Sequence, residues 1–528
     1  MNCGFSPWRD LRLHCLSVLA IIFLMALPIR ALSGPQANLN GSWMGTIETA
    51  GFYGTMELDI TGPESLRKAE MKLSNDPAQV FSLPLRDLLV SGNQISFWTQ
   101  KEIVGIEYRL SFIGRLEGDN LEGTLSVTHD NLSVGKGTWN LKPSSALKAH
   151  GVELPAPSGP YAVGLQTFHW VDTSRSEVFT DDPNDRREVT VHVWYPAQPR
   201  AGATPAPYYS DFPDLKNVKT GLPVAQKTIA ETLRNHSIRD AAISPAKTRF
   251  PILLFSPGGG SCDFFYTTIL EEMASQGYVV ASMSHTYQSY SVLLSDGRVV
   301  TGQVSPTNEY TKQRIEVDAD DAVFVLSQME KLNAAKLRSQ FAGRLDPTRV
   351  GIFGHSQGGQ VAPLACRIDR RFKACLNLDG RFWDGPFYRD LVNGNRDLTQ
   401  PFMHFVSKLP EKTDAELVPL KMTRREWVQN LDRLRSRSNA LFESVKSVSY
   451  RVTLLGADHV TFSDYYFLFT DLDLYRMAAN RRSLRIVREY TLAFFNKYLK
   501  NRNSELLEGS SSSYPEVVVE SFRSSLRR

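Results

Sequence analysis

The sequence has 528 residues, a formal net charge of +4, 42% hydrophobic residues and 22% charged residues. At roughly 100–200 residues per domain, this length predicts two to four domains and a large buried core. The 35 glycines and 28 prolines are near average usage and exclude collagen-like and low-complexity chains. The nearly balanced charge, without a run of Lys or Arg, argues against nucleic acid as a partner.

The first residues have the pattern of a secretory signal. Arg9 and Arg12 precede a short stretch, residues 16–29, that is apolar except for one serine, and Ala31-Leu32-Ser33 follows as a small-x-small cleavage pattern. A membrane anchor needs about 20 apolar residues, which this stretch does not reach. We therefore expect residues 1–33 to be a signal peptide and the protein to be exported, either periplasmic or extracellular.

Cysteine usage does not indicate a disulfide framework. Cys3 and Cys15 lie in the signal, which leaves Cys262, Cys366 and Cys375. Buried free thiols are the favoured interpretation, and a Cys366–Cys375 pair stays open. Because no Cys/His set has zinc spacing and no HExxH or CxxC occurs, we expect no metal.

Residues 36–143 are predicted to form a small all-β domain. Glycine, asparagine and aspartate separate short alternating runs, a pattern typical of a barrel or sandwich; these runs are 41–45, 56–60, 95–98, 108–112 and 121–125. Gly-x-Trp occurs at 41–43 and 137–139, and the segment resembles the lipocalin-like modules that precede some secreted hydrolases. Two roles stay open: a lipid- or polymer-handling domain, or a packing module whose tryptophans plug a barrel end.

The sequence pattern of the remaining chain defines three segments. Residues 144–159 are bordered and interrupted by prolines and are predicted to be a semi-rigid linker. From 160 to 500, apolar strands alternate with helical stretches, which predicts an α/β fold around a mostly parallel sheet; the strands are 189–195, 252–255, 279–281 and 350–353, and the helices include 266–276, 314–332 and 483–500. We expect 501–528 to be a polar, unstructured tail.

The strongest motif is Gly354-His-Ser-Gln-Gly358, directly after the strand 350–353 and before a helix expected to begin near Gln357. This context is typical of a nucleophile elbow, in which glycines permit a turn too tight for side chains and the serine hydroxyl projects above the sheet. The helix N-terminus directs backbone N–H groups at developing negative charge. The motif predicts Ser356 as a nucleophile.

A serine of this kind needs a base, which in α/β-hydrolases follows it in the chain. Only His404 and His459 follow Ser356. His404 lies within the apolar run 402–406, which favours a core position. His459 follows a strand that ends in a loop, where the base is expected, so we predict that His459 is the base.

The orienting acid is predicted to be Asp379, which ends the apolar run 374–378 and can reach an imidazole from the end of that strand. Asp458 is adjacent to the base but is expected to point elsewhere, and Asp414 lies in a charged segment. The alternative for Asp379 is a turn-initiating aspartate before Gly380.

A glycine run, Phe255-Ser-Pro-Gly-Gly-Gly260, follows the strand 252–255. Such a run lets backbone N–H groups approach an oxyanion, together with the N–H of Gln357. An ordinary flexible turn is the alternative.

These segments together resemble plasma-type platelet-activating-factor acetylhydrolases and the related dienelactone-hydrolase-like esterases; they are Val191–Pro196, Phe255–Gly260, Gly354–Gly359, Leu378–Gly380 and His459–Asp464. The resemblance covers about residues 160–500. It implies an α/β-hydrolase fold with Ser356, Asp379 and His459 as the triad and Gly259 with Gln357 as oxyanion donors. Pro257 departs from the pattern, because many members have histidine there.

The resemblance implies a serine esterase that works through an acyl-enzyme and needs no cofactor. It implies a small ester or phospholipid substrate, with a short or oxidised sn-2 acyl group, and at most transient contact with a lipid surface. No obligate protein partner is inferred. The alternatives are a general carboxylesterase or polyester hydrolase and, in another class, a non-catalytic lipid- or glycan-binding protein, which a fluorophosphonate probe of serine reactivity separates.

Four aromatic residues, Phe382, Trp383, Tyr287 and Tyr290, lie just past predicted strand ends. They are candidates for the wall of a compact acyl pocket, and general core packing is an equally open role for them.

The signal pattern yields a test of export. Expressed in a Gram-negative host with its own N-terminus, the protein should be recovered from the periplasm with a mature chain that begins near Gly34. N-terminal sequencing of the purified protein measures this directly. A cytoplasmic enzyme that retains Met1 would contradict the signal assignment.

Overall fold

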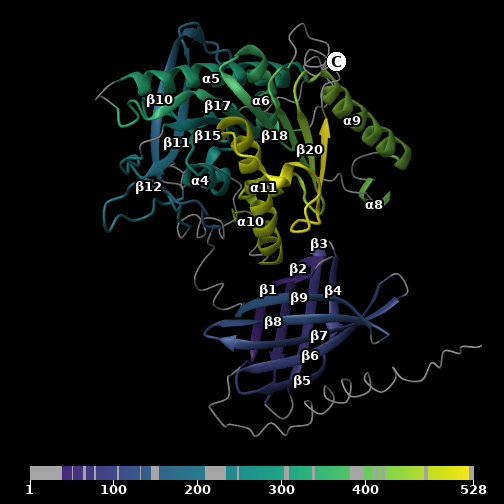
Figure 1. Ribbon diagram of the computed structural model, residues 1–528. Helices are drawn as coiled ribbons and strands as arrows, with labels where there is room; N and C mark the ends of the chain where they lie inside the picture. Colours follow the sequence, from purple (N-terminus) through teal and green to yellow (C-terminus); the bar gives the residue numbers. More distant parts are fainter. Residues whose placement is uncertain are drawn as a thin grey trace, which may run out of the picture.

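Two sheets contain nearly all the strands of the chain, an all-β sheet followed by a larger α/β sheet (Figure 1). The computed structural model describes residues 39–49, 52–63, 67–76, 79–103, 106–130, 132–143, 154–208, 233–246, 249–302, 308–335, 339–380, 398–407, 414–417, 422–468 and 474–522. The predicted signal peptide lies outside these residues. Within them, no helix is both long and apolar enough to cross a membrane.

The first sheet has nine strands, and every neighbouring pair is antiparallel. Their order is β4-β3-β2-β1-β9-β8-β7-β6-β5. Strand β4, at one end of this order, contacts β6 near the other end, so the sheet is nearly closed. The strands are β1 (Gly41–Thr49), β2 (Phe52–Thr61), β3 (Lys68–Asp76), β4 (Gln79–Pro84), β5 (Arg86–Ser91), β6 (Gln94–Ile103), β7 (Ile106–Glu117), β8 (Asn120–His129) and β9 (Leu132–Pro143).

Apolar side chains fill the interior of this barrel-like sheet. Trp43 and Trp139, from the two Gly-x-Trp motifs, are both buried in one cluster with residues from most of the strands. Phe97 stacks on Phe112 with ring centroids 4.7 Å apart. Both indole N–H groups donate to main-chain carbonyls, that of Trp43 to Leu39 and that of Trp139 to Thr124. The tryptophans therefore pack the interior of the sheet.

The second sheet has ten strands in the order β12-β10-β11-β14-β13-β17-β18-β19-β20-β21. The six strands from β14 to β20 are parallel to one another, and antiparallel pairs flank them. The bounds are β10 (Ala162–Ser176), β11 (Arg186–Ala197), β12 (Ile238–Arg239), β13 (Phe250–Ser256), β14 (Val279–His285), β17 (Leu345–His355), β18 (Phe372–Leu378), β19 (Phe402–Ser407), β20 (Ser449–Leu454) and β21 (Val517–Phe522), with a separate hairpin β15 (Ser291–Leu293) and β16 (Val299–Thr301).

Helices cover both faces of this sheet, which explains its continuous apolar strands. Leu253 and Phe255 of β13 pack in one cluster with α4 and α11, and Ile252 and Leu254 pack in the other with α5 and α6. The described helices are η3 (Asp263–Tyr266), α4 (Thr267–Ser275), α5 (Asn308–Ala334), α6 (Gln357–Ile368), α8 (Asp414–Leu417), α9 (Arg424–Ser444), η5 (His459–Phe462), α10 (Tyr465–Leu468), α11 (Leu474–Lys500) and η6 (Glu505–Leu507). This arrangement is the predicted α/β-hydrolase fold.

Cys262, Cys366 and Cys375, the three cysteines after the predicted signal peptide, are buried free thiols. Cys366 on α6 and Cys375 on β18 are close enough for their thiols to interact, but no disulfide joins them.

The expectation of an unstructured tail at 501–528 is wrong for most of this segment. Strand β21 pairs antiparallel with β20 and completes the sheet. Leu507, Tyr514 and Val517 are buried in the core cluster of α4 and α11. The segment is polar on average, but its few apolar residues bury in the core and its strand pairs with the edge of β20. Without β21, the backbone groups of that edge would be unpaired.

The second half of the predicted linker is also part of the catalytic fold. Ser158 donates to Glu272 of α4 at 2.6 Å, and Arg488 of α11 donates to the carbonyl of Ala156 at 3.0 Å. The chain is therefore attached to these two helices before β10 begins.

Deletion of residues 504–528 should destabilise the protein, because it removes β21 and three buried side chains worth roughly 1.5–3 kcal/mol each. We expect Tm to fall by at least about 5 °C and the exposed edge of β20 to promote aggregation. Differential scanning calorimetry and light scattering measure the two effects. Deletion of 523–528 alone is the matched control and should leave Tm unchanged; equal Tm values for both deletions would show that β21 adds no stability.

Candidate active site

Ser356 lies between β17 and α6 in a strained backbone conformation with positive φ, at φ 55° and ψ −117°. Such a conformation costs a non-glycine residue on the order of 1–3 kcal/mol and persists only where the surroundings enforce it. A Cβ on Gly354 would lie 2.3 Å from the carbonyl oxygen of Gly358, and one on Gly358 would lie 1.9 Å from that of Ser256. The turn therefore requires both glycines, and it projects the serine from the end of the strand.

Ser356, His459 and Asp379 form a hydrogen-bonded chain. The Ser356 Oγ lies 2.9 Å from His459 Nε2, and His459 Nδ1 lies 2.7 Å from Asp379 Oδ2. The carboxylate is fully buried, whereas 46% of the His459 side chain is exposed. The chain thus runs from a buried acid to a base that solvent reaches, and Nδ1–H donates to the acid while Nε2 accepts from the serine.

Asp379 is held rigidly just past the end of β18. Its backbone N–H donates to the carbonyl of Phe405 at 2.7 Å, and its Oδ1 accepts from the Ser407 N–H at 2.9 Å and from the Ser407 hydroxyl at 3.0 Å. The positive φ of 48° at Asp379 belongs to the turn in which Asn377 accepts the N–H of Gly380. Asp379 thus contacts His459 and also lies in a turn before Gly380. The contact expected of an orienting acid and the position expected of a turn-initiating aspartate therefore occur together.

The other candidates have different partners. Asp458 accepts from the N–H groups of Val460 and Thr461 and caps η5, whose first residue is His459. Asp414 is exposed and pairs with Arg424. His404 is buried in β19, with its ring 6.2 Å from that of Phe402.

The predicted oxyanion donors lie on two segments that meet above Ser356. A Cβ on Gly258 would lie 3.3 Å from the Ser356 Cβ, so the glycine run passes directly over the serine. A Cβ on Gly259 would lie 2.6 Å from the Gln357 side-chain oxygen, so the Gln357 side chain lies against the glycine run. Gln357 is the first residue of α6, where backbone N–H groups are available to an anion.

A second histidine, His355, links the loop of His459 to the glycine run. It was not identified from the sequence. Its Nε2 faces the carbonyl of His459 at 2.8 Å and must donate to it, so Nδ1 accepts from the Tyr266 hydroxyl at 2.9 Å. That hydroxyl accepts the N–H of Gly258 at 3.1 Å. Burial, together with the nearby His459, lowers the pKa of His355 to about 3, so the ring stays neutral. Its place inside the elbow motif was the only signal, because Tyr266 is distant in the sequence.

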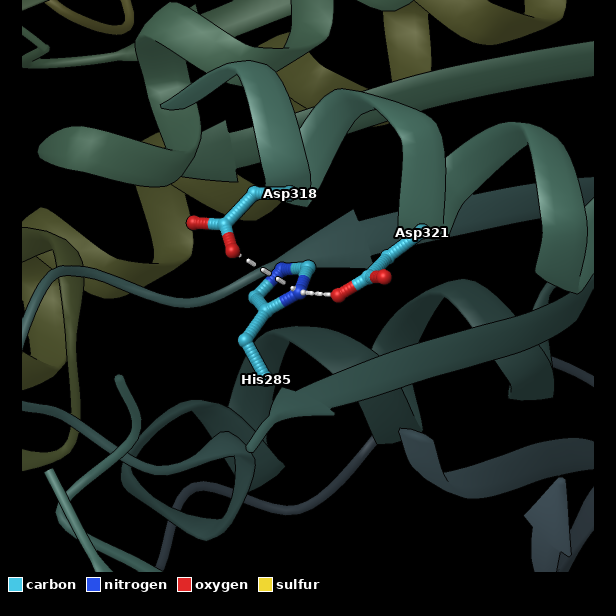
Figure 2. A group of neighbouring side chains, drawn as sticks. All are labelled: His285, Asp318 and Asp321. Atoms are coloured by element: carbon cyan, nitrogen blue, oxygen red, sulfur yellow. Dashed lines mark hydrogen bonds and ion pairs between the residues drawn. The ribbon is translucent and has the colours of Figure 1, made fainter. Parts of the chain in front are cut away.

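His285, Asp318 and Asp321 form a buried group away from the hydrogen-bonded chain of Ser356 (Figure 2). Both carboxylates come from α5, and His285 Nδ1 lies 3.2 Å from Asp318 and 2.9 Å from Asp321. Such a set could ligate a cation, but the Arg187 guanidinium binds both oxygens of Asp321. Although burial opposes it, Arg187 holds the pKa of Asp321 well below its usual range, and burial raises the pKa of Asp318. An ion-pair network therefore explains the group without a metal.

Two of the four predicted pocket residues, Phe382 and Trp383, lie outside the described residues. Tyr287 is half-buried beside Arg298 and the carboxylates of Glu177 and Asp185, and burial together with the two carboxylates raises its pKa. The acyl-pocket role of Tyr287 stays a prediction. Tyr290 packs near Phe265 with ring centroids 6.4 Å apart, and its pocket role stays a prediction.

Comparison with known proteins places this chain in a family. The family model of platelet-activating factor acetylhydrolase, isoform II, matches residues 146–513. A relative from Arthroderma benhamiae, named probable 1-alkyl-2-acetylglycerophosphocholine esterase, is 25% identical over 397 residues, which are 69% of this chain and 93% of its own. The platelet-activating factor acetylhydrolase of Gallus gallus is 22% identical over 398 residues, 66% of this chain and 84% of its own.

A solved structure of a ferulic acid esterase from Streptomyces cinnamoneus is also similar. It matches with a TM-score of 0.53 and 25% identity and covers 70% of this chain and 99% of its own. The chain therefore belongs to the platelet-activating factor acetylhydrolase, isoform II, family and is an esterase with an α/β-hydrolase fold.

Proposed function

We propose that this protein is an exported serine esterase that releases short acyl groups, above all from the sn-2 position of platelet-activating-factor-like phospholipids. The observation that carries the proposal is the hydrogen-bonded chain of Ser356, His459 and Asp379 in a member of this family. The names of the relatives support the phospholipid class. Export rests on the sequence pattern of residues 1–33 alone.

The reaction begins with proton transfer from the Ser356 hydroxyl to His459 Nε2 as the oxygen attacks the ester carbonyl. The carbonyl oxygen becomes an oxyanion, and the N–H groups of Gly259 and Gln357 donate to it. Each such donor contributes on the order of 3–4 kcal/mol to the transition state. His459 then gives the proton to the departing alcohol, which leaves the acyl group on Ser356.

Water completes the cycle by the same route. His459 takes a proton from the water as its oxygen attacks the acyl-enzyme, and returns that proton to Ser356 when the acid leaves. Asp379 keeps the Nδ1–H of His459 in place and stabilises the imidazolium that forms twice in the cycle. Burial of this carboxylate, with two donors from Ser407, keeps it oriented.

A general carboxylesterase is the second candidate. It is supported by the ferulic acid esterase structure, which this chain covers along nearly its full length and whose described substrate is not a phospholipid. The two candidates share the reaction at Ser356 and differ only in the alcohol and acyl groups that are accepted.

Substitution of Ser356, His459 or Asp379 by alanine should each lower kcat by about 10⁴–10⁶-fold, with strong non-additivity because the three act as a unit. Hydrolysis of a chromogenic acetyl ester by each purified variant measures this. His404→Ala is the matched control: a second histidine after the elbow whose loss should lower Tm but leave kcat of the folded protein nearly unchanged. Loss of turnover in folded His404→Ala, with activity retained in His459→Ala, would make the base assignment wrong.

Acyl length should separate a short-acyl esterase from a lipase. An added methylene that fits gains only about 0.8 kcal/mol, whereas one that clashes costs more, so we expect acetyl to butyryl esters to have the highest kcat/KM. A profile over C2 to C16 esters of p-nitrophenol, 2-acyl glycerophosphocholines and feruloyl esters measures both acyl and alcohol preference below the micellar concentration. A maximum at C12 or longer would contradict the proposal, and a preference for feruloyl esters would favour the second candidate.

A further inference from the structure

The glycine run forms a loop, residues 256–261, which we call the oxyanion loop, and a second segment holds it from both ends. Ser256 Oγ is hydrogen-bonded to His285 Nε2 at 3.0 Å. The N–H of Gly260 donates to the carbonyl of Gln288 at 3.1 Å. Both partners lie where the chain leaves β14, so the position of that exit determines the position of the loop.

Helix α5 in turn holds the exit from β14. Besides its contact with His285, Asp318 accepts from Gln288 Nε2 at 2.5 Å. Arg314, one turn earlier on the helix, donates from Nε to the Gln288 side-chain oxygen at 2.9 Å. His285, Gln288, Arg314 and Asp318 are all at least nine-tenths buried, so these contacts exclude water.

The same carboxylate reaches the elbow. The second oxygen of Asp318 accepts from the Gln357 side-chain amide at 3.0 Å. The other end of that amide, its oxygen, packs against Gly259 in the close approach described above. The Gln357 side chain therefore lies between the Asp318 carboxylate and the oxyanion loop. The two backbone N–H groups proposed to bind the oxyanion are those of Gln357 itself and of Gly259, against which its side chain packs.

We propose that Asp318 is a positioning residue that acts through the Gln357 side chain to hold the N–H groups of Gln357 and Gly259 at the spacing an oxyanion needs. The inference rests on the proposed function. The physical reason is geometric. An N–H group that is displaced from the oxyanion stabilises the transition state much less, since a misplacement of about 1 Å can cost on the order of 100-fold in rate. Asp318 touches no reacting atom, so its removal should impair the transition state and leave substrate binding nearly intact.

The alternative is that this network only supports the fold. Ser256, His285 and Asp321 are hydrogen-bonded in the sequence serine, histidine, aspartate, as in a catalytic triad. All three are buried, however, and no substrate can reach them. Asp321 pairs with Arg187 in the core, and breaking that pair is expected to destabilise the protein strongly. The experiment therefore avoids Asp321 and changes the two ends of the Asp318–Gln357 contact. Each end also contacts Gln288, so the coupling between the two substitutions, and not either one alone, reports on their shared contact.

The test is a double-mutant cycle of Asp318→Asn and Gln357→Met in the full chain, assayed on a short-acyl ester. We expect each single variant to lower kcat roughly 10- to 100-fold with KM within about twofold. The double variant should be no slower than the slower single variant, because both changes break one contact. An alkyl boronic acid, which forms a tetrahedral adduct on the serine, should lose affinity in parallel with kcat, and the pH profile of kcat should keep its midpoint.

Asp320→Asn is the matched control, because it makes the same substitution on the same helix at an exposed carboxylate; it should retain wild-type kcat. Asp318→Asn with kcat within about twofold of wild type, or effects that multiply in the double variant, would overturn the inference. If Asp318→Asn does not fold, Gln357→Met still tests it, since wild-type kcat in that variant contradicts the role. A wild-type enzyme inactive on every ester would instead overturn the proposed function and this inference with it.

Discussion

The close approach of three backbone segments around Ser356 is the constraint on which the site depends. The turn between β17 and α6 is so near the end of β13 that side chains at Gly354 or Gly358 would overlap main-chain atoms. This contact imposes the strained conformation of Ser356, and it places the oxyanion loop over the serine. The contact exists because β13 and β17 are neighbouring parallel strands, whose carboxyl ends lie at one edge of the sheet.

The rest of the triad follows from the same parallel order. Strand β18 pairs with β17, and the Ser356 N–H donates to the carbonyl of Leu378, so the residue after β18 is brought beside the serine. Strand β20 lies two positions further and ends at the turn that carries His459. Neutral His355 then links the base loop to the oxyanion loop through Tyr266. The parts of the site are thus connected by the backbone and by one buried histidine.

The histidine–aspartate group of His459 and the one of His285 differ in access to solvent. His459 is nearly half exposed, whereas His285 is 3% exposed and shares its carboxylates with arginine and glutamine side chains. A base must receive a proton from a substrate-facing group, and only the first histidine is placed to do so. His285 is instead buried and held in one position by its carboxylate partners, which suits a role in supporting the oxyanion loop.

Local sequence determined the α/β class, the elbow and the candidates Ser356, Asp379 and His459, because each rests on short-range rules: apolar strands, tight glycine turns and polar residues at strand ends. Residues without such a signal were missed. Asp318, Tyr266 and His355 acquire their partners only when helices and strands pack, and the C-terminal strand β21 forms only because β20 offers an open edge. Hydrogen bonds between residues far apart in the chain depend on the packed sheet, and only the tertiary structure decided them.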